Sequence, residues 1–101
     1  MRLKYLPEAL ADLDAAAAWY ESRQEGLGDS FLTAVERVVR RLLAFPHSGR
    51  RLVGEYRYAR ILSFPYGMVY RLESDSLVIR AVWHAEQNPE SLRSRLDSSG
   101  P

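Results

Sequence analysis

The chain has 101 residues, of which 47% are hydrophobic and 11% aromatic, so it can bury one core but is too short for two. It contains no cysteine, which excludes disulfides, thiolate zinc sites and cysteine nucleophiles. The net charge is +1 at pH 7, and no apolar stretch is long enough for a signal sequence or a membrane span. We therefore expect a soluble, cytoplasmic protein with a single domain over residues 1–96 and a flexible polar tail over residues 97–101.

The charges are distributed unevenly along the chain. Residues 1–36 hold three basic and seven acidic side chains, whereas residues 37–60 hold seven arginines and one acid, Glu55. Only Lys4 among the 14 basic residues is a lysine. The planar guanidinium group suits carboxylates and phosphates, and it stays charged when partly desolvated. The arginine-rich block is therefore either a solvated surface or a binding surface for an acidic partner.

The first half of the sequence predicts a short strand over residues 2–6 followed by two helices. Pro7 suits the first turn of a helix, and the alanine run at residues 15–18 has high helix propensity and lets a second helix approach closely. Gly26 and Gly28 should end this helix. Its apolar stripe is predicted from three- and four-residue spacing as Leu10, Leu13, Ala17 and Tyr20.

A second helix is predicted to begin near Asp29 or Ser30, either of which can cap it, and to stop at Pro46. The side chains predicted to be buried recur at helical spacing, while the arginines at 37, 40 and 41 fall off that stripe. The predicted buried stripe consists of Phe31, Val35, Val38, Leu42 and Phe45.

The second half of the sequence is typical of strands. Residues 56–62 place Tyr56 and Tyr58 on one face and Arg57 and Ala59 on the other. Two further strands, residues 68–72 and 77–83, are joined by a short polar loop, and residues 89–96 can form a terminal helix. The sequence therefore predicts an α+β fold in which an N-terminal strand and an antiparallel two-helix hairpin pack on a mainly antiparallel sheet with a three-strand meander, followed by a short C-terminal helix.

Five segments carry a resemblance to a known family. They are Trp19-Tyr20, Pro46-His47-Ser48-Gly49-Arg50, the strand with Arg57 and Arg60, Phe64-Pro65-Tyr66 running into Val69-Tyr70-Arg71, and Val82-Trp83-His84. In order and spacing they resemble the RelE/ParE superfamily of type II toxin–antitoxin toxins. The resemblance implies a cognate antitoxin encoded beside the toxin. It leaves two activities open, because RelE-like members cut messenger RNA in the ribosomal A site and ParE-like members are similar to gyrase poisons.

The residues favour the ParE-like branch. RelE-like enzymes use two lysines on the first meander strand, an arginine early on the second, and an arginine and a tyrosine after the last. The four cation positions fall here on Tyr58, Arg60, Gly67 and Ala85, so Arg60 is the one cation retained. The resemblance thus implies inhibition of DNA gyrase or another topoisomerase by binding.

Two alternatives stay open. A ribosome-dependent RNA endonuclease would have its catalytic groups among Arg60, Arg57, Arg71 and His84. A degenerate, non-toxic module would only bind antitoxins. The second alternative arises because His84 is followed by Ala-Glu-Gln, where many ParE-like members have a pair of arginines, and because Leu92 stands where an aromatic residue is expected.

The candidate site residues fall into two groups. Target binding is assigned to a cationic sheet surface, and the alternative for its arginines is cross-strand pairing with Glu73 or Asp75; these residues are Arg57, Arg60, Arg71, Arg80 and His84. Antitoxin binding is assigned to aromatic and basic residues of the hairpin and the following loop, namely Trp19, Tyr20, Arg37, Arg41, Arg50 and Arg51. Trp19 and Tyr20 cannot both face the core, so one of them is a candidate anchor for the antitoxin.

We expect no cofactor and no metal site, since His47 and His84 form no ligand pattern with the scattered acids. We also expect the antitoxin's C-terminal segment to be disordered alone and to fold along the helical hairpin and the arginine-bearing sheet, because an acidic amphipathic partner would satisfy the arginines.

Overall fold

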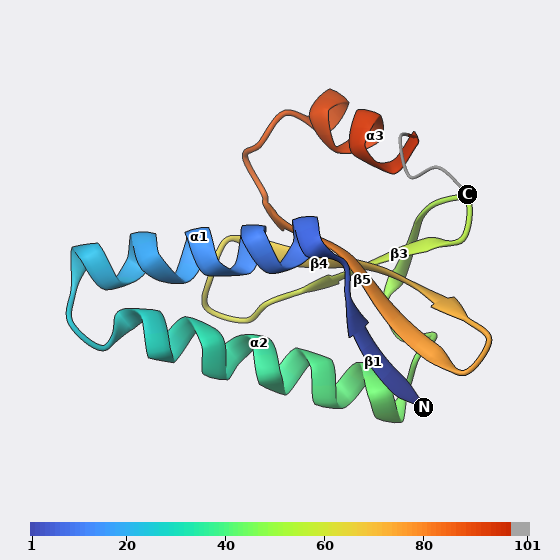
Figure 1. Ribbon diagram of the computed structural model, residues 1–101, viewed down its shortest axis with the longest axis horizontal. Coiled ribbons are helices and arrows are strands. Elements are labelled where there is room, and N and C mark those ends of the chain that lie inside the picture. The colour runs from blue at the N-terminus through green and yellow to red at the C-terminus, as the bar shows by residue number, and fades with distance from the viewer. Residues whose placement is uncertain (98–101) are drawn as a thin grey trace.

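The computed structural model describes residues 1–97, which form a five-stranded sheet and three helices (Figure 1). The strand order is β1-β5-β4-β3-β2; β1 runs parallel to β5, and the other neighbours are antiparallel. The elements are β1 (Arg2–Tyr5), α1 (Pro7–Arg23), α2 (Leu27–Ala44), β2 (Arg50–Val53), β3 (Tyr56–Arg60), β4 (Tyr66–Glu73), β5 (Ser76–His84) and α3 (Pro89–Asp97). The predicted α+β fold, with its helical hairpin, meander and C-terminal helix, is confirmed.

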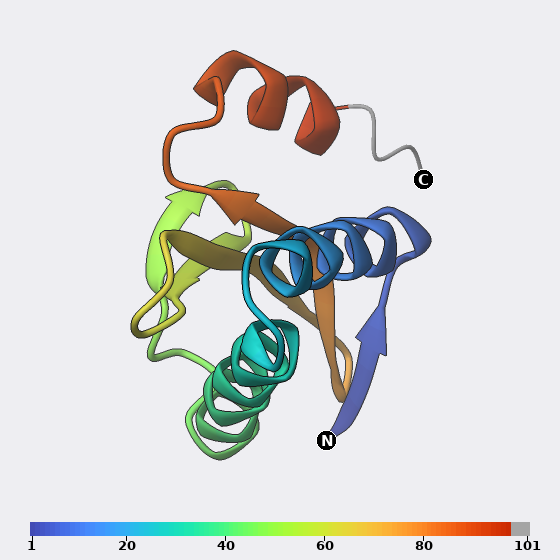
Figure 2. The ribbon, with the colours of Figure 1, turned by 90° about the vertical axis from the view of Figure 1, so that its left-hand side faces the viewer.

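The sheet separates two apolar layers. The α1–α2 hairpin covers one face and α3 lies over the other, as Figures 1 and 2 show. The larger core, on the hairpin side, includes Phe31, Leu42, Met68 and Tyr70, and the smaller core under α3 is built from Tyr56, Val69, Ala81, Trp83 and Leu96. Within residues 1–97, no helix combines the length and apolar character needed to cross a membrane.

The turn between the two helices differs from the prediction. Helix α1 ends at Arg23, and α2 already begins at Leu27 after Gly26, whose φ of 85° is left-handed. Gly28 therefore lies inside α2, where a Cβ would stand 2.7 Å from the carbonyl oxygen of Ala17. The predicted caps Asp29 and Ser30 were wrong, because the carboxylate of Glu21 accepts hydrogen bonds from the N–H groups of Gly26 (3.0 Å) and Gly28 (2.9 Å) at the start of α2.

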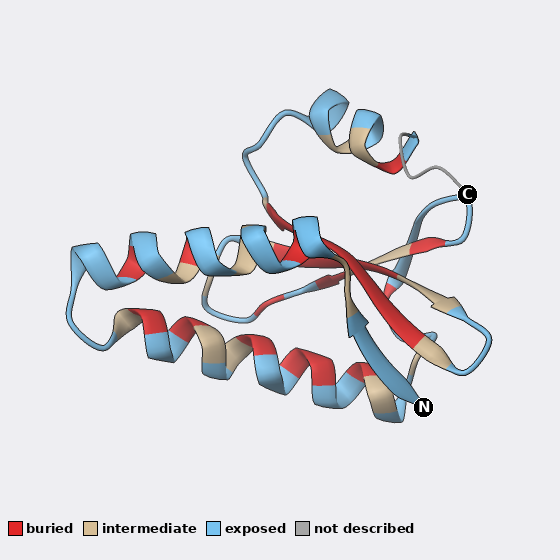
Figure 3. Cartoon of the chain, viewed as in Figure 1, coloured by how far each residue is buried: buried red, intermediate tan, exposed pale blue. Residues whose placement is uncertain are grey.

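Two predicted core positions are exposed. Leu10 is 45% exposed, and the buried residues of α1 are the small Ala9 and Ala16 together with Tyr20. Phe45 is 66% exposed because it lies just beyond the last helical residue, where helical periodicity no longer sets the direction of the side chain. The remaining predicted stripe of α2 is buried, as the alternating burial along that helix in Figure 3 shows.

The sheet contains two features that were not predicted. Residues 50–53 form the edge strand β2, which pairs with β3, where a loop was expected. In β5, Val69 pairs with Ala81 and Tyr70 pairs with Ile79, so Arg80 is an extra residue in a β-bulge. The predicted tail began at Asp97, which is the last residue of α3; residues 98–101 lie outside the described part of the chain.

Candidate functional site

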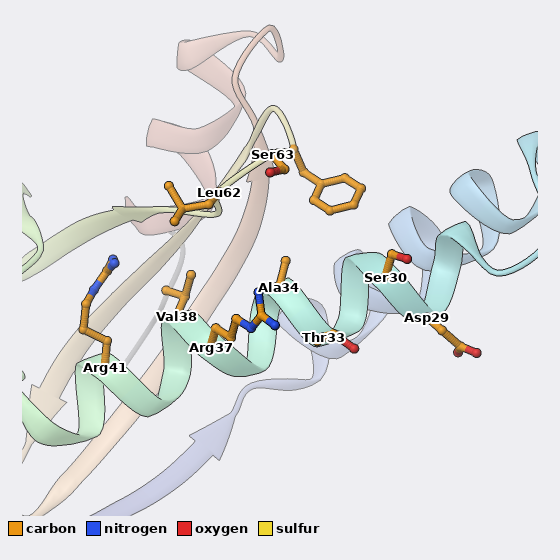
Figure 4. Close-up of a pocket in the computed structure, with 10 residues that line it drawn as sticks. Asp29, Ser30, Thr33, Ala34, Arg37, Val38, Arg41, Leu62 and Ser63 are labelled. Atoms are coloured by element: carbon orange, nitrogen blue, oxygen red, sulfur yellow. The ribbon is translucent and has the colours of Figure 1, made fainter.

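A groove of about 650 Å³ lies between α2 and the loop that joins β3 to β4 (Figure 4). We call it the α2 groove. Its apolar residues come from both walls: Ala34 and Val38 from the helix, Leu62 and Phe64 from the loop. The polar residues that line it all belong to α2 or to the loop's tip, and they are Asp29, Ser30, Thr33, Arg37, Arg41 and Ser63.

Two antitoxin candidates, Arg37 and Arg41, lie on this groove. They are one helical turn apart and both are exposed, and neither side chain has an ion pair or hydrogen bond within residues 1–97. Opposite them Leu62 is 68% exposed, although it is a large apolar side chain. The loop that carries Leu62 is fixed by Ser63, whose φ of 73° is left-handed, and by the ring of Phe64, which packs 4.9 Å from that of Tyr20. The groove thus combines an apolar wall with two free cations.

A second candidate surface lies on the α3 side of the sheet. We define this sheet surface by Arg50, Tyr58, Arg60 and Gly67, which neighbour one another across strands β2, β3 and β4. The ring of Tyr58 covers Gly67 so closely that a Cβ at position 67 would lie 2.0 Å from Cζ of Tyr58. The guanidinium of Arg50 lies 5.2 Å from the centre of the Tyr58 ring. The side chain of Arg60 is exposed and has no ion pair or hydrogen bond in the described chain.

Arg57 and Arg71 were expected to share one face of the sheet, but they lie on opposite faces. Arg57 pairs with Tyr70 across the strands and therefore faces the hairpin side, where its Nη1 donates to the carbonyl oxygens of His47 (3.1 Å) and Gly49 (2.8 Å). Arg71 faces the α3 side and its Nε donates to Oε2 of Glu73 at 2.7 Å, which raises the pKa of Arg71. The alternative of local pairing with Glu73 describes Arg71, and Arg57 holds the loop before β2.

Arg80 was expected on an exposed surface, and this was wrong. The bulge turns its side chain inward, where it is 3% exposed. Its Nη1 donates to Oε1 of Glu8 at 2.7 Å and its Nη2 donates to the carbonyl oxygen of Arg95 at 2.5 Å. The hydrogen bond from Arg80 holds the pKa of Glu8 below its ordinary value. Arg80 therefore ties β5 to both α1 and α3.

A neighbouring set of contacts was missed at the sequence level. Asp12 accepts hydrogen bonds from both terminal nitrogens of Arg95 (2.5 and 3.0 Å) and from the N–H of Val82 (3.0 Å). The guanidinium of Arg95 also lies 5.0 Å from the centre of the Trp83 ring, and the bond to Asp12 raises the pKa of Arg95. Glu8 and Asp12, one turn apart on α1, were the only signal for this anchoring of α3.

His84 and the aromatic pair of α1 line a second hollow of about 520 Å³. Trp19 is 50% exposed and Tyr20 is 8% exposed, so the prediction that only one of them faces the core is confirmed. The His84 ring packs 4.9 Å from that of Tyr66, and its Nδ1 accepts the N–H of Glu86 at 2.9 Å. In residues 1–97, no three histidines or acids gather where they could hold a metal ion.

Arg50 and Arg51 lie on strand β2 instead of in a loop. Because successive side chains of a strand alternate, the two point to opposite faces of the sheet. Arg50 stacks on Tyr58, as described above, and Arg51 borders a small hollow with His47 and Arg57. The two arginines therefore cannot bind the same group of a partner, and each offers a separate contact.

The fold is similar to those of solved toxin structures, and the sequence matches one family model. The solved structure described as "Chromosomal ParDE TA system from P. aeruginosa" is similar at 25% identity and a TM-score of 0.64, covering 85% of this chain and 97% of that one. The "YoeB/ParE toxin from Agrobacterium tumefaciens" shares the fold at 17% identity and a TM-score of 0.62, with 83% and 98% covered. No curated protein sequence matches the chain. Residues 3–89 match the family model of the ParE toxin of the type II toxin-antitoxin system parDE, and the chain therefore belongs to the ParE toxin family.

Proposed function

We propose that the chain inhibits DNA gyrase or a related topoisomerase by binding it, and that a cognate antitoxin neutralises this activity. Membership of a type II toxin family supports the toxin role and implies an antitoxin partner. The choice of target rests on what the sheet surface can do chemically, because the same fold serves both cutting and binding.

The contact between Tyr58 and Gly67 carries the proposal. Cleavage of RNA needs a general base and several cations around the scissile phosphate. Here the Tyr58 ring fills the space that a side chain at position 67 would need, and Arg60 is the one cation left at the positions suggested by the resemblance to nucleases. An aromatic ring next to arginines is typical of a surface that binds a partner, because tyrosine and arginine often contribute most of the binding energy of an interface.

The other arginines considered for catalysis do not converge on Arg60. Arg57 is held by backbone carbonyls on the hairpin side of the sheet, and Arg71 is paired with Glu73. In the proposal Arg60 is the centre of the target contact, and Arg71 and His84 are peripheral candidates. Arg57 and Arg80 instead hold the fold together.

The antitoxin is proposed to cover the α2 groove. Arg37 and Arg41 supply two exposed cations, and Leu62 supplies apolar surface for an amphipathic segment. Trp19 is a further candidate anchor at the other end of the hairpin, whereas Tyr20 belongs to the core. Arg50 and Arg51 are candidates for contact with a more distant part of the antitoxin.

A supercoiling assay with purified gyrase and relaxed plasmid tests the target. The wild-type chain should inhibit supercoiling, and Arg60→Ala should inhibit less, whereas Arg40→Ala, which removes an exposed arginine from α2, should match the wild type. In parallel, transcripts from cells expressing the chain are mapped for cuts. Unimpaired supercoiling together with codon-specific cuts that Arg60→Ala abolishes would favour the nuclease. Normal growth without antitoxin, with antitoxin binding retained, would favour the non-toxic module.

A further inference from the structure

The α2 groove has an ordered distribution of charge along its length. Asp29 lies in the first turn of α2, whereas Arg37 and Arg41 lie in its second half. At 1.5 Å per residue, Asp29 and Arg41 are about 18 Å apart along the helix axis. Figure 4 shows the apolar side chains of Ala34, Val38 and Leu62 between these ends. One end of the groove is therefore acidic, the middle apolar and the other end basic.

None of these charges is neutralised within the described chain. Asp29, Arg37 and Arg41 have no ion pair among residues 1–97, although ion pairs form elsewhere through Arg71, Arg80 and Arg95. Leu62 is 68% exposed above the groove. An apolar wall of this kind, bordered by unpaired charges of opposite sign at its two ends, fits a partner segment whose own charges are arranged in the complementary order.

We propose that the α2 groove docks an amphipathic helix of the antitoxin that runs antiparallel to α2, with acidic residues in its first turns facing Arg37 and Arg41 and a basic residue in its last turn facing Asp29. This inference rests on the proposed neutralisation by an antitoxin, and it adds the direction and charge order of the bound segment. Roughly three helical turns, about 12 residues, span the distance from Arg41 to Asp29.

The antiparallel direction follows from the electrostatics of helices. Acidic side chains stabilise the first turn of a helix and basic side chains stabilise its last turn. A partner helix whose first turn lies at Arg41 and whose last turn lies at Asp29 can pair its charges with those of the groove and keep this favourable order. A parallel helix would need basic residues in its first turn and acidic residues in its last, which opposes its own dipole. The antiparallel helix also places its positive N-terminal end near the negative C-terminal end of α2.

Two synthetic peptides of about 15 residues test the direction. They share one composition and one apolar stripe, but the first has its acids in the opening turns and its lysines at the end, and the second has the reverse order. Binding to the full chain is measured by fluorescence anisotropy, and helicity by circular dichroism. The acid-first peptide should bind on the order of tenfold more tightly and gain helicity on binding. Equal affinities, or no binding of either peptide, would overturn the proposal.

Charge-reversal variants localise the contact. Arg37→Glu/Arg41→Glu should abolish the preference for the acid-first peptide, and replacing the opening acids of that peptide by lysines should restore binding to this variant. Arg40→Glu is the matched control, because Arg40 is exposed on the same helix but lines a different hollow beside β1. Asp29→Lys should weaken the acid-first peptide, whereas Glu36→Lys should not. Loss of the preference in Arg40→Glu and its retention in Arg37→Glu/Arg41→Glu would contradict the assignment.

The supercoiling assay separates this proposal from the proposed target. Arg37→Glu/Arg41→Glu should still inhibit gyrase, because both side chains lie away from the sheet surface, and its thermal unfolding should match that of the wild type. If the wild-type chain leaves gyrase unaffected while the two peptides are still discriminated, the target is wrong and the docking direction stands. If gyrase is inhibited but the peptides bind alike, the docking direction is wrong and the target stands.

Discussion

The phenol ring of Tyr58 lies directly over Gly67 of the neighbouring strand, where even a methyl group would clash with it. The contact is specific to glycine, because the ring occupies the volume that any side chain at position 67 would fill. It also lets the Tyr58 ring pack beside the smaller core under α3, next to Arg50. The two residues therefore act as one unit in stability and in shaping the surface.

The unit can be tested by a double-mutant cycle. Gly67→Ala should lower the free energy of unfolding by about 1–2 kcal/mol, because the new methyl group displaces the Tyr58 ring. In a Tyr58→Ala background, the same substitution should be neutral or slightly stabilising, since glycine is unfavourable inside a strand. Urea unfolding of the four proteins measures the coupling. Equal effects of Gly67→Ala in both backgrounds would show that the ring does not depend on the glycine.

The hydroxyl of Tyr70 ties the loop after α2 to the core. It donates to the carbonyl oxygen of Pro46 at 2.8 Å and accepts the buried N–H of Gly49 at 3.0 Å. Tyr70→Phe should cost about 1–3 kcal/mol of unfolding free energy, because the Gly49 donor loses its partner. Amide exchange at Gly49 should also become faster. Tyr66→Phe is the control, since the Tyr66 hydroxyl has no hydrogen bond within residues 1–97; a similar cost in both variants would argue against the specific role of Tyr70.

Asp12 should control how firmly α3 is attached. Asp12→Ala removes the acceptor for Arg95 and for the N–H of Val82, so it should cost about 2–3 kcal/mol. The gain in hydrogen exchange should concentrate in residues 89–97. Asp14→Ala, on the same helix and without an ion pair in the described chain, should leave exchange in α3 unchanged. Uniform loosening of the whole sheet in Asp12→Ala would show that the carboxylate acts on global stability instead.

Glu21 predicts a specific loss of stability in acid. The N–H groups of Gly26 and Gly28 hold the pKa of Glu21 below its ordinary value. Because the folded-state pKa is lowered, the stabilisation is fully present above the ordinary value and is lost as the pH falls through the lowered one. The difference in melting temperature between wild type and Glu21→Gln should thus be largest near neutral pH and should shrink as the pH falls below the ordinary glutamate range. Glu25→Gln, which removes an exposed carboxylate without an ion pair in the described chain, is the matched control. A gap between wild type and Glu21→Gln that persists in acid would contradict the account.

The sequence was most informative where periodicity was strong. The stripe of α2 from Phe31 to Leu42 is buried, and Tyr56 and Tyr58 lie opposite Ala59, because alternation and helical spacing report directly on local geometry. Helix α1 was harder to interpret. Its small alanines pack against the sheet, so burial does not follow the largest apolar side chains and Leu10 is exposed.

The site depended on features that local pattern does not encode. The short strand β2 is rich in arginine and its pattern predicts a loop, since an edge strand exposes most of its side chains. The ion pair between Glu8 and Arg80 joins residues 72 positions apart, and that between Asp12 and Arg95 joins residues 83 apart. The α2 groove likewise forms only when Leu62 and Phe64 are brought over α2. Such contacts depend on how the elements are arranged in space, whereas the sequence pattern predicts the order of the elements and not which distant residues meet.

The extra residue at Arg80 shifts the alternation of side chains along β5, so that odd-numbered residues face the hairpin before it and α3 after it. Before it, Leu77 and Ile79 point toward the hairpin; after it, Val82 does so, while Ala81 and Trp83 turn toward α3. Deleting Arg80 would reverse the direction of every side chain that follows it in β5. The indole of Trp83 would then point toward the hairpin, into the space that Val82 now fills. A single-codon deletion should therefore be far more damaging here than any substitution at the same position.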